Sequence, residues 1–457
     1  MKRFLLILCL ISAEVVWAGP KLLYEEDPTL LTTTIEIVVQ SGSSEDPMDK
    51  TGIATTIAEL LLRGTQTKDR ATFQSTLERM GGAISGSASH DTIEFSGEVI
   101  KENTDAFLDL ITEFLTKPSF SEKEFKSLMQ ENLAAIQHIK NVNTRLGGLA
   151  LRREVFAGTP LERPTQGTLK TLKAIQLKDL KDRYKNSFHK GNFLFAVASP
   201  LKKSQIEKKL EAIWNVLPDG KASVSPEIAL KIPSEPTLIV VNKPHTSSGS
   251  VLMGQAGIVA KEPDRYDLYL GNFSFGGEPL VSRLFNVVRG ALGWTYAIGS
   301  TYQAMGSLSK QKGLFMVYTT PSIEFTTKSL FKILNMWDSY LQGGLKKDEI
   351  DLAQDSLVNS YPFGFDSANK RLGWKVMSEL YDVPVLSPSE YESKIRAIGN
   401  GELVKRLRKH HTARGWIISV VADAKVIQKQ LDEEQKNIPA DKRFKIAKIL
   451  KPEQIIE

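Results

Sequence analysis

Residues 51–65, TGIATTIAELLLRGT, have the spacing of a helix that could carry a metal site. Ile53 and Ile57 are one turn apart and predict a buried face. Thr55 and Glu59 are also one turn apart, the separation at which two histidines of a zinc peptidase hold one ion. No histidine occurs in this segment. The segment therefore predicts the frame of a catalytic helix without its metal ligands.

The first 18 residues, MKRFLLILCLISAEVVWA, predict a secretory signal peptide. A basic start at Lys2 and Arg3 precedes an apolar run, and small residues lead to a cleavage point after Ala18. The apolar run is shorter than the roughly 20 residues of a membrane-spanning helix, so an N-terminal anchor is the weaker alternative. We expect export across the inner membrane to the periplasm, with an extracellular destination as the alternative.

Cysteine and charge exclude several classes of site. Cys9 is the only cysteine and lies in the signal peptide, so the mature chain would have no disulfide, thiolate zinc site or cysteine nucleophile. Loss of Lys2, Arg3 and Glu14 would lower the formal charge by one from +6. We expect no nucleic-acid partner, because no block of five like charges occurs. We also expect no integral membrane segment in the mature chain.

The rest of the chain reads as two halves, 19–218 and 237–457, joined by a linker at 219–236 that is rich in proline, serine and small residues. Each half opens with β-rich sequence and continues through amphipathic helices. LKDRYKNSFHKGNFLFAVAS (180–199) and LVKRLRKHHTARGWIISVVAD (403–423) both predict a basic helix, a short turn and an apolar strand. This echo predicts duplication of an α+β unit rather than a doubly wound parallel sheet.

Four segments in order carry a resemblance to a known family. They are VQSGSSEDPMDKTGIA, LERMGGAISGSASHDTIEFSGEV, FAGTPLERPTQGTLKTLKAI and FGGEPLVSRLFNVVRGALGWTYAIGS. With them the chain resembles the M16 (insulinase-like, pitrilysin) metallopeptidase family, in the short bacterial form related to the mitochondrial processing peptidase. The resemblance covers nearly the whole mature chain. It implies two homologous α/β-sandwich halves that face each other as a clamshell.

The family's zinc site is degenerate in this chain. Its pattern is His-x-x-Glu-His on the first helix with a glutamate further on. The resemblance places Thr55 and Glu59 at the histidines, Ala58 at the catalytic glutamate and Ala135 at the later glutamate. A threonine, two alanines and one carboxylate cannot hold a catalytic zinc. We therefore expect no metal in this chain and no peptidase activity from it alone.

Other residues offer weaker metal-binding alternatives. Glu59 and Glu131 could form an unfamiliar site, although a helix-face pair between Glu59 and Arg63, one turn on, is the simpler interpretation. Surface or capping roles are expected for the histidines, which are His90, His138, His189, His245 and the adjacent pair His410 and His411.

Arg289 and Tyr296, in SRLFNVVRGALGWTY, fall where the resemblance implies the family's arginine–tyrosine pair. In active relatives this pair lies across the cleft from the zinc and holds the substrate carbonyl and backbone. A tyrosine hydroxyl backed by a guanidinium can stabilise a developing oxyanion. We expect the helix from about Leu280 to end near Gly293 and TYAIGSTY to form a strand. The structural alternative is a salt bridge for Arg289 and a half-buried position for Tyr296.

The segment GGAISGSASH (81–90) corresponds to the family's edge strand, which pairs with extended peptides by β-augmentation. Ser85, Gly86 and Ser87 are the expected substrate-binding positions, because small residues let another backbone approach closely. The alternative is that they mark a weak, flexible edge.

Together these features predict the non-catalytic subunit of an exported M16-type zinc peptidase. The expected partner is a zinc-bearing M16 homologue, in a heterodimer or a larger assembly, and the expected substrate is an extended peptide. Zinc is expected in the partner alone. The alternative is a structural or peptide-binding protein of this fold with no peptidase role.

Overall fold

The computed structural model describes residues 19–457 except 224–227, 229, 231–232, 303–310 and 441–442. The predicted signal peptide, with Cys9, lies outside the described residues, as does part of the predicted linker at 219–236. No described helix is both long and apolar enough to cross a membrane.

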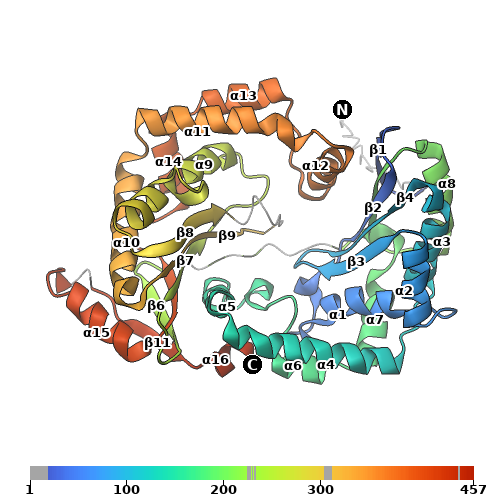
Figure 1. Cartoon of the computed structure of the whole chain (residues 1–457), viewed down its shortest axis with the longest axis horizontal. Helices are drawn as coiled ribbons and strands as arrows, with labels where there is room; N and C mark the ends of the chain where they lie inside the picture. Colours follow the sequence, from blue (N-terminus) through green and yellow to red (C-terminus); the bar gives the residue numbers. More distant parts are fainter. Residues whose placement is uncertain (1–18, 224–227, 229, 231–232, 303–310, 441–442) are drawn as a thin grey trace, which may run out of the picture.

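The first half forms a five-stranded sheet in the order β1-β5-β2-β4-β3 (Figure 1). β1 and β5 run parallel, and the other neighbours are antiparallel. The strands are β1 (Leu22–Glu26), β2 (Thr32–Val39), β3 (Ala83–Ala88), β4 (Ile93–Ile100) and β5 (Phe193–Ser199). The helices are α1 (Ile53–Leu60), α2 (Arg70–Arg79), α3 (Thr104–Thr116), α4 (Glu122–His138), α5 (Asn143–Val155), α6 (Leu169–Ala174), α7 (Leu177–Ser187) and α8 (Lys203–Val216).

The second half forms a six-stranded sheet in the order β11-β6-β10-β7-β9-β8. The strands are β6 (Thr237–Asn242), β7 (Ser250–Ala256), β8 (Thr295–Tyr302), β9 (Leu314–Pro321), β10 (Ile417–Ala422) and β11 (Ile446–Leu450). The helices are α9 (Arg265–Asn272), α10 (Thr326–Gly343), α11 (Lys347–Ser360), α12 (Ala368–Tyr381), α13 (Pro388–Arg396), α14 (Asn400–His410), α15 (Ala424–Glu434) and α16 (Pro452–Ile456), with π-helical turns η8 (Phe273–Gly277) and η9 (Phe285–Ala291).

The two sheets repeat the same topology. β6, β10, β7, β9 and β8 follow the order of β1, β5, β2, β4 and β3, and each pair of neighbours keeps its parallel or antiparallel sense. β11 is an additional strand beside β6. The predicted helix–turn–strand echo is confirmed as α7 followed by β5 and α14 followed by β10. The α+β class and the two homologous halves are therefore confirmed.

One helix of each half packs on the sheet of the other half. α12 of the second half packs on β1 and β5, and α5 of the first half packs on β7 and β10 (Figure 1). Every residue of β5 and β10 is buried, because helices cover both faces of these central strands. On α12, Leu372, Val376 and Leu380 pack in one cluster with Leu194 of β5. Each such buried side chain stabilises the contact by roughly 1.5–3 kcal/mol.

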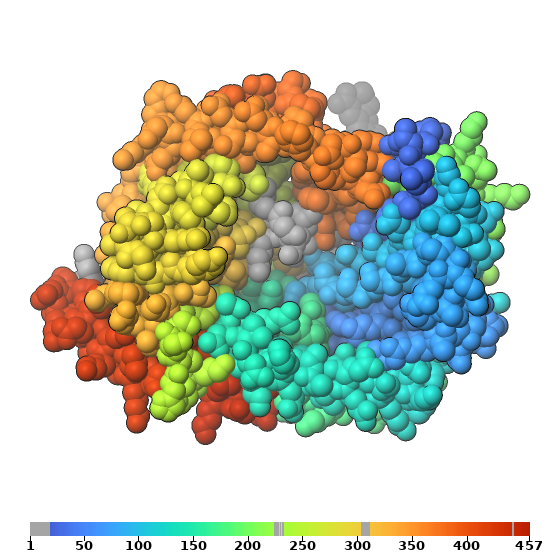
Figure 2. All heavy atoms as spheres, in the orientation of Figure 1, coloured from blue at the N-terminus to red at the C-terminus, as the bar shows by residue number. Residues whose placement is uncertain are grey.

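The C-terminal helix also returns to the first half. α16 packs beside α5, and Ile455 and Ile456 belong to the first half's hydrophobic core. The halves are thus held together by packed helices as well as by the linker. The molecular surface is hollowed between them (Figure 2).

Candidate functional site

The helix that corresponds to the zinc helix, α1, begins at a left-handed residue. Gly52 has φ 107°, a conformation that favours glycine. The Asp46 carboxylate accepts hydrogen bonds from the backbone N–H groups of Gly52, at 3.0 Å, and Ala54, at 3.3 Å. Burial raises the pKa of Asp46 to about 6, against the opposing effect of Arg183 and these N–H groups. Asp46 thus caps α1 from six residues upstream.

The four degenerate positions carry no set of zinc ligands. The Thr55 hydroxyl donates to the Thr165 carbonyl oxygen at 2.8 Å. Ala58 is fully buried, and Ala135 lies exposed on α4. Glu59 is the one carboxylate, and Asn132 of α4 donates to it at 2.8 Å. Because zinc needs three or four nitrogen, sulfur or oxygen ligands, these residues do not fit the ion.

The predicted pair between Glu59 and Arg63 is wrong. Arg63 instead holds Glu131 in a two-pronged contact, with nitrogen–oxygen distances of 3.0 and 2.5 Å. This contact lowers the pKa of Glu131 to about 2. Burial raises the pKa of Glu59, although the bond from Asn132 opposes the shift. The alternative metal site of Glu59 and Glu131 also loses support, because both carboxylate oxygens of Glu131 accept hydrogen bonds from Arg63.

The expectation of surface or capping roles for the histidines is wrong for His411. Its side chain is 4 % exposed, and the Tyr302 hydroxyl lies 2.6 Å from its Nε2. Burial lowers its pKa to about 3. His90 is half-buried between Ser43 Oγ, at 3.1 Å, and Arg152 Nη1, at 2.9 Å. Burial and the nearby Arg152 also lower the pKa of His90 to about 3, so both rings are neutral near pH 7.

One described group of side chains has the composition of a metal site. Single oxygen or nitrogen atoms of Glu262, Asp264 and His410 lie within 4.8 Å of one another. However, Lys409 Nζ is 2.6 Å and Arg406 Nε is 3.2 Å from the Asp264 carboxylate. Two permanent cations therefore already neutralise this acidic group, and it is best described as an ion-pair cluster.

Arg289 and Tyr296 are adjacent in space. The Arg289 guanidinium carbon lies 4.6 Å from the centre of the Tyr296 ring and 4.7 Å from that of Phe285. Tyr296 is 80 % exposed, and no ion pair of Arg289 is found within the described ranges. The half-buried position that the structural alternative gave Tyr296 is therefore wrong, and no described carboxylate supplies the salt bridge that it gave Arg289. No hydrogen bond, ion pair or ring contact among the described residues joins this pair to α1.

The backbone around the pair is irregular on both sides. Arg289 lies on the π-helical turn η9, which ends before Gly293 at φ 65°. The predicted strand TYAIGSTY is confirmed as β8. The pairing of β8 with β9 shifts register between Thr295 and Ile298, so Tyr296 lies in a β-bulge. Both π-helical turns and bulges recur at functional sites, where they re-aim a side chain.

Thr295 fixes this bulge. Its hydroxyl donates to the Ala297 carbonyl oxygen at 2.9 Å and accepts from the Thr319 hydroxyl at 3.0 Å. Thr295 is buried while Tyr296 projects outward. The exposure of the tyrosine therefore follows from a buried hydrogen-bond arrangement beneath it.

The expected peptide-binding strand lies at a sheet edge. β3 pairs with β4 alone among the described strands, and Ser85 and Ser87 are exposed. Gly86 faces α1, where an added Cβ would lie 2.3 Å from the Ala58 carbonyl oxygen. The close packing of β3 on α1 thus explains why position 86 is a glycine, which the sequence alone did not indicate.

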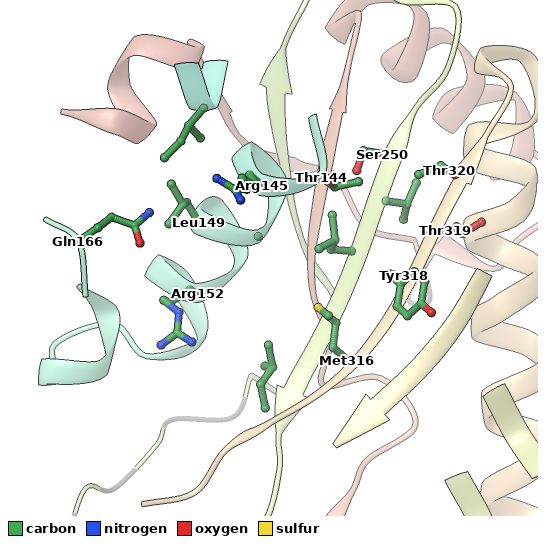
Figure 3. Close-up of a pocket in the computed structure, with 15 residues that line it drawn as sticks. Thr144, Arg145, Leu149, Arg152, Gln166, Ser250, Met316, Tyr318, Thr319 and Thr320 are labelled. Atoms are coloured by element: carbon green, nitrogen blue, oxygen red, sulfur yellow. The ribbon is translucent and has the colours of Figure 1, made fainter. Parts of the chain in front are cut away.

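A cavity of 530 Å³ lies between α5 of the first half and β7 and β9 of the second (Figure 3). Arg145 and Arg152 lie on α5 at one side of it, and Met316 and Tyr318 lie on β9 at the other. No acidic residue is among the described residues that line it, which are Ile139, Thr144, Arg145, Gly148, Leu149, Arg152, Gln166, Ser250, Val251, Leu252, Leu314, Met316, Tyr318, Thr319 and Thr320. The cavity thus offers positive charge and apolar surface between the halves.

Sequence profiles identify the class to which both halves belong. The profile of insulinase (peptidase family M16) matches residues 21–169, and that of the peptidase M16 inactive domain matches residues 174–357. The chain is therefore a protein of the M16 fold with two homologous halves. It belongs to peptidase family M16.

Several relatives extend along most of the chain. A protein of Helicobacter pylori named "Non-peptidase homolog YmxG" is 23% identical over 93% of this chain and 99% of its own length. An "Uncharacterized zinc protease" of Rickettsia bellii is 24% identical over 64% of this chain and 69% of its own. The solved structure of a peptidase M16 inactive domain from Pseudomonas fluorescens has a TM-score of 0.80 at 23% identity, covering 89% of this chain and 96% of that one. The matches and the missing zinc ligands support a non-catalytic protein of this fold.

Three features of the site were missed from the sequence. Asp46 lies six residues before Gly52, which is outside the spacing of ordinary helix caps. Asn132 is distant in sequence from Glu59, so only tertiary packing could reveal their bond. The bulge at Tyr296 has no sequence signal, because neither of its central residues is a glycine.

Proposed function

We propose that this chain is the non-catalytic subunit of a split M16 peptidase. It would pair with a homologue that carries the zinc motif and would contribute Arg289 and Tyr296 to a shared site. The observation that supports this proposal most directly is the exposed Tyr296 ring beside a guanidinium that has no described ion-pair partner. A chain selected only as a scaffold would gain nothing from holding these two groups free.

In the proposed reaction, the zinc and its activated water belong to the partner. Tyr296 would donate its hydroxyl proton in a hydrogen bond to the oxyanion that develops on the scissile carbonyl. Arg289, stacked on the Tyr296 ring, would hold that ring and add positive charge. Ser85 and Ser87 on β3, which pairs with no described strand other than β4, would flank the backbone of an extended peptide. We propose that the assembly acts in the periplasm, after removal of residues 1–18.

The test is a peptidase assay with a quenched fluorescent peptide and zinc. This protein, its zinc-motif homologue and their mixture are compared with mixtures that contain Arg289→Ala or Tyr296→Phe. Loss of one oxyanion donor typically lowers kcat by about 10²-fold or more. We expect the mixture to cleave the peptide and neither protein to cleave it by itself. In the mixture, Tyr296→Phe should lower kcat by about 10²-fold or more.

Arg79→Ala is the matched control, because Arg79 is exposed on α2 and belongs to the other half. It should leave the mixture's rate unchanged. Analytical ultracentrifugation of each mixture separates loss of catalysis from loss of assembly. A mixture no faster than the homologue alone would contradict the proposal.

A second function is favoured by one observation. The Helicobacter pylori relative that spans 93% of this chain is named as a non-peptidase homologue. A peptide-binding or structural role without proteolysis would fit that name and the cationic cavity between the halves. Peptide binding that survives Tyr296→Phe, together with an inactive mixture, would support this second function.

A further inference from the structure

The second half contains a separate cavity of 350 Å³ lined by aromatic side chains. It lies between α9, the end of α11, α12 and α13. None of its described lining residues belongs to the 530 Å³ cavity between α5, β7 and β9. Its lining consists of Ala260, Arg265, Tyr266, Tyr269, Leu357, Ser360, Tyr361, Gly364, Trp374, Met377, Val383, Pro384 and Tyr391. This volume is within the range of small-molecule sites, which are mostly apolar with a few convergent polar groups.

The aromatic walls are held in place by their own contacts. Tyr361 and Tyr391 stack with ring centres 3.7 Å apart and an angle of 5°. The Tyr361 hydroxyl donates to the Leu386 carbonyl oxygen at 2.9 Å, and Trp374 Nε1 donates to the Gly364 carbonyl oxygen at 3.1 Å. The cavity therefore has fixed flat walls before any ligand binds.

Arg265 places a positive charge in this apolar setting. It is 8 % exposed, and its guanidinium stacks 4.5 Å from the centre of the Tyr266 ring. It donates to the Tyr266 hydroxyl at 2.9 Å and weakly to the Glu262 carbonyl oxygen at 3.4 Å. Within the part of the chain that the structure describes, Arg265 belongs to no ion pair.

Of the carboxylates near Arg265 along the chain, Glu262 and Asp264 are already paired, whereas Asp267 forms no ion pair with a described residue and burial raises its pKa. Asp264 holds Lys409 Nζ at 2.6 Å and His410 Nε2 at 2.9 Å. Lys409 Nζ also lies 3.6 Å from the Glu262 carboxylate. A buried guanidinium has five N–H donors and is costly to leave without a counter-ion. The site therefore has unused capacity to bind an anion.

A second polar group at the cavity also has no described partner. Tyr391 is 6 % exposed, and its hydroxyl makes no hydrogen bond with any described residue. Its ring forms a wall of the cavity, and the Tyr266 ring meets it edge-on at 6.0 Å. Tyr391 thus offers a free hydroxyl at the same cavity as the unpaired cation.

We propose that this cavity binds an aromatic carboxylate. The ring of the ligand would lie against Tyr361, Tyr391 and Trp374, and its carboxylate would accept hydrogen bonds from Arg265 and the Tyr391 hydroxyl. Such a ligand is either the C-terminal aromatic residue of a peptide or a free aromatic acid. The site is distinct from the Arg289–Tyr296 pair and does not depend on the proposed peptidase role.

A ligand in the cavity would contact α12, the helix of the second half that packs on the first sheet. Trp374 and Met377 line the cavity from α12, whereas Leu372 and Val376 on the other side of this helix pack on the first sheet. A bound ring would therefore brace the helix that joins the halves. We expect binding to raise the melting temperature of the whole chain.

The test is calorimetric titration of the full mature chain with N-acetyl-L-phenylalanine, its neutral amide, and the peptide Gly-Gly-Phe. We expect the acid to bind about tenfold or more tightly than the amide, because a charge-assisted contact to the guanidinium is lost in the amide. Binding of the peptide as tight as that of the acid would identify a chain terminus as the source. Binding of the acid alone would identify a free aromatic acid.

Variants separate this cavity from other positive surfaces. Arg265→Gln should bring the acid-to-amide ratio close to one, Tyr391→Phe should lower it by a few fold, and Arg79→Gln should leave it unchanged. Circular dichroism shows whether each variant folds. The ratio of acid to amide affinity in the unmodified chain tests the proposal even if a variant fails to fold. The proposal is overturned if the unmodified chain binds neither compound saturably, or if folded Arg265→Gln keeps the full ratio.

Discussion

An alanine at position 86 would bring its Cβ to 2.3 Å from the carbonyl oxygen and 2.9 Å from the carbonyl carbon of Ala58. Both atoms belong to the backbone of α1, so no side-chain rotation can relieve the contact. α1 or β3 would have to move by several tenths of an ångström, although both pack into the first half's core. Gly86 has no positive φ, so the expected penalty is one of packing alone.

The expected cost follows from two opposing effects. Overpacking a close-packed core costs about 1–3 kcal/mol. Replacing a strand glycine by alanine recovers about 0.5–1 kcal/mol through the unfolded chain. We therefore expect Gly86→Ala to lower the free energy of unfolding by about 1–2 kcal/mol, measured by urea denaturation.

Ser85→Ala is the matched control, since Ser85 is the exposed neighbour on the same strand and should change stability by less than about 0.5 kcal/mol. Calorimetric melting should show Gly86→Ala shifted down by a few degrees while Ser85→Ala stays near the unmodified protein. If the two variants unfold at the same urea concentration, the contact between β3 and α1 is not as close as described.

Three further predictions concern stability. Gly147→Ala should be less stable than Gly148→Ala by about 1 kcal/mol, because its Cβ would meet the side-chain atom Leu252 Cδ1 at 2.7 Å, which must shift. Gly148→Ala on the same helix should add about 0.5–1 kcal/mol, since its Cβ meets its nearest neighbour at 4.0 Å, and urea midpoints of the two variants decide. Burial lowers the pKa of His411 to about 3, so the unfolded chain binds the proton first and stability falls as the pH falls from 6.5 towards 3. Between pH 6.5 and 5 this histidine contributes a loss of about 1.6 kcal/mol, and urea titrations should show the fall in stability to be smaller by that amount in His411→Gln, where His90 still contributes its own loss. Thr295→Val should lower the free energy of unfolding by about 1–2 kcal/mol, because the Thr319 hydroxyl loses its buried acceptor. If NMR shows that the Tyr296 ring keeps its contacts with Arg289 in this variant, Thr295 does not fix the bulge as described.

Much of the fold followed from local pattern. The apolar runs that became β5 and β10 each came after a basic amphipathic helix, and this echo predicted the duplicated unit. TYAIGSTY formed a strand, and the helix before it ended by the left-handed Gly293. These features depend on residues close together in the sequence, where spacing and turn chemistry carry the information.

The rest of the site depends on contacts between distant residues. Arg63 is one turn from Glu59, yet it pairs with Glu131 of α4, because tertiary packing places that carboxylate within reach of both of its nitrogens. His411 lies in a basic segment that predicted exposure, yet it is buried beside Tyr302. No periodicity within one segment could have shown either arrangement.

The exchange of helices between the halves bears directly on how the candidate site is built. The edge strands β3 and β8 occupy the same position in their sheets, and β3 carries Ser85 and Ser87 while β8 carries Tyr296. α5 and α12 pack on the opposite sheets and hold the two halves together, and Ile228 and Leu230 of the linker pack against the same interface as α5. α12 carries apolar residues for the first sheet on one side and Trp374 of the aromatic cavity on the other. A ligand of that cavity would therefore contact the helix through which the second half packs on the first sheet.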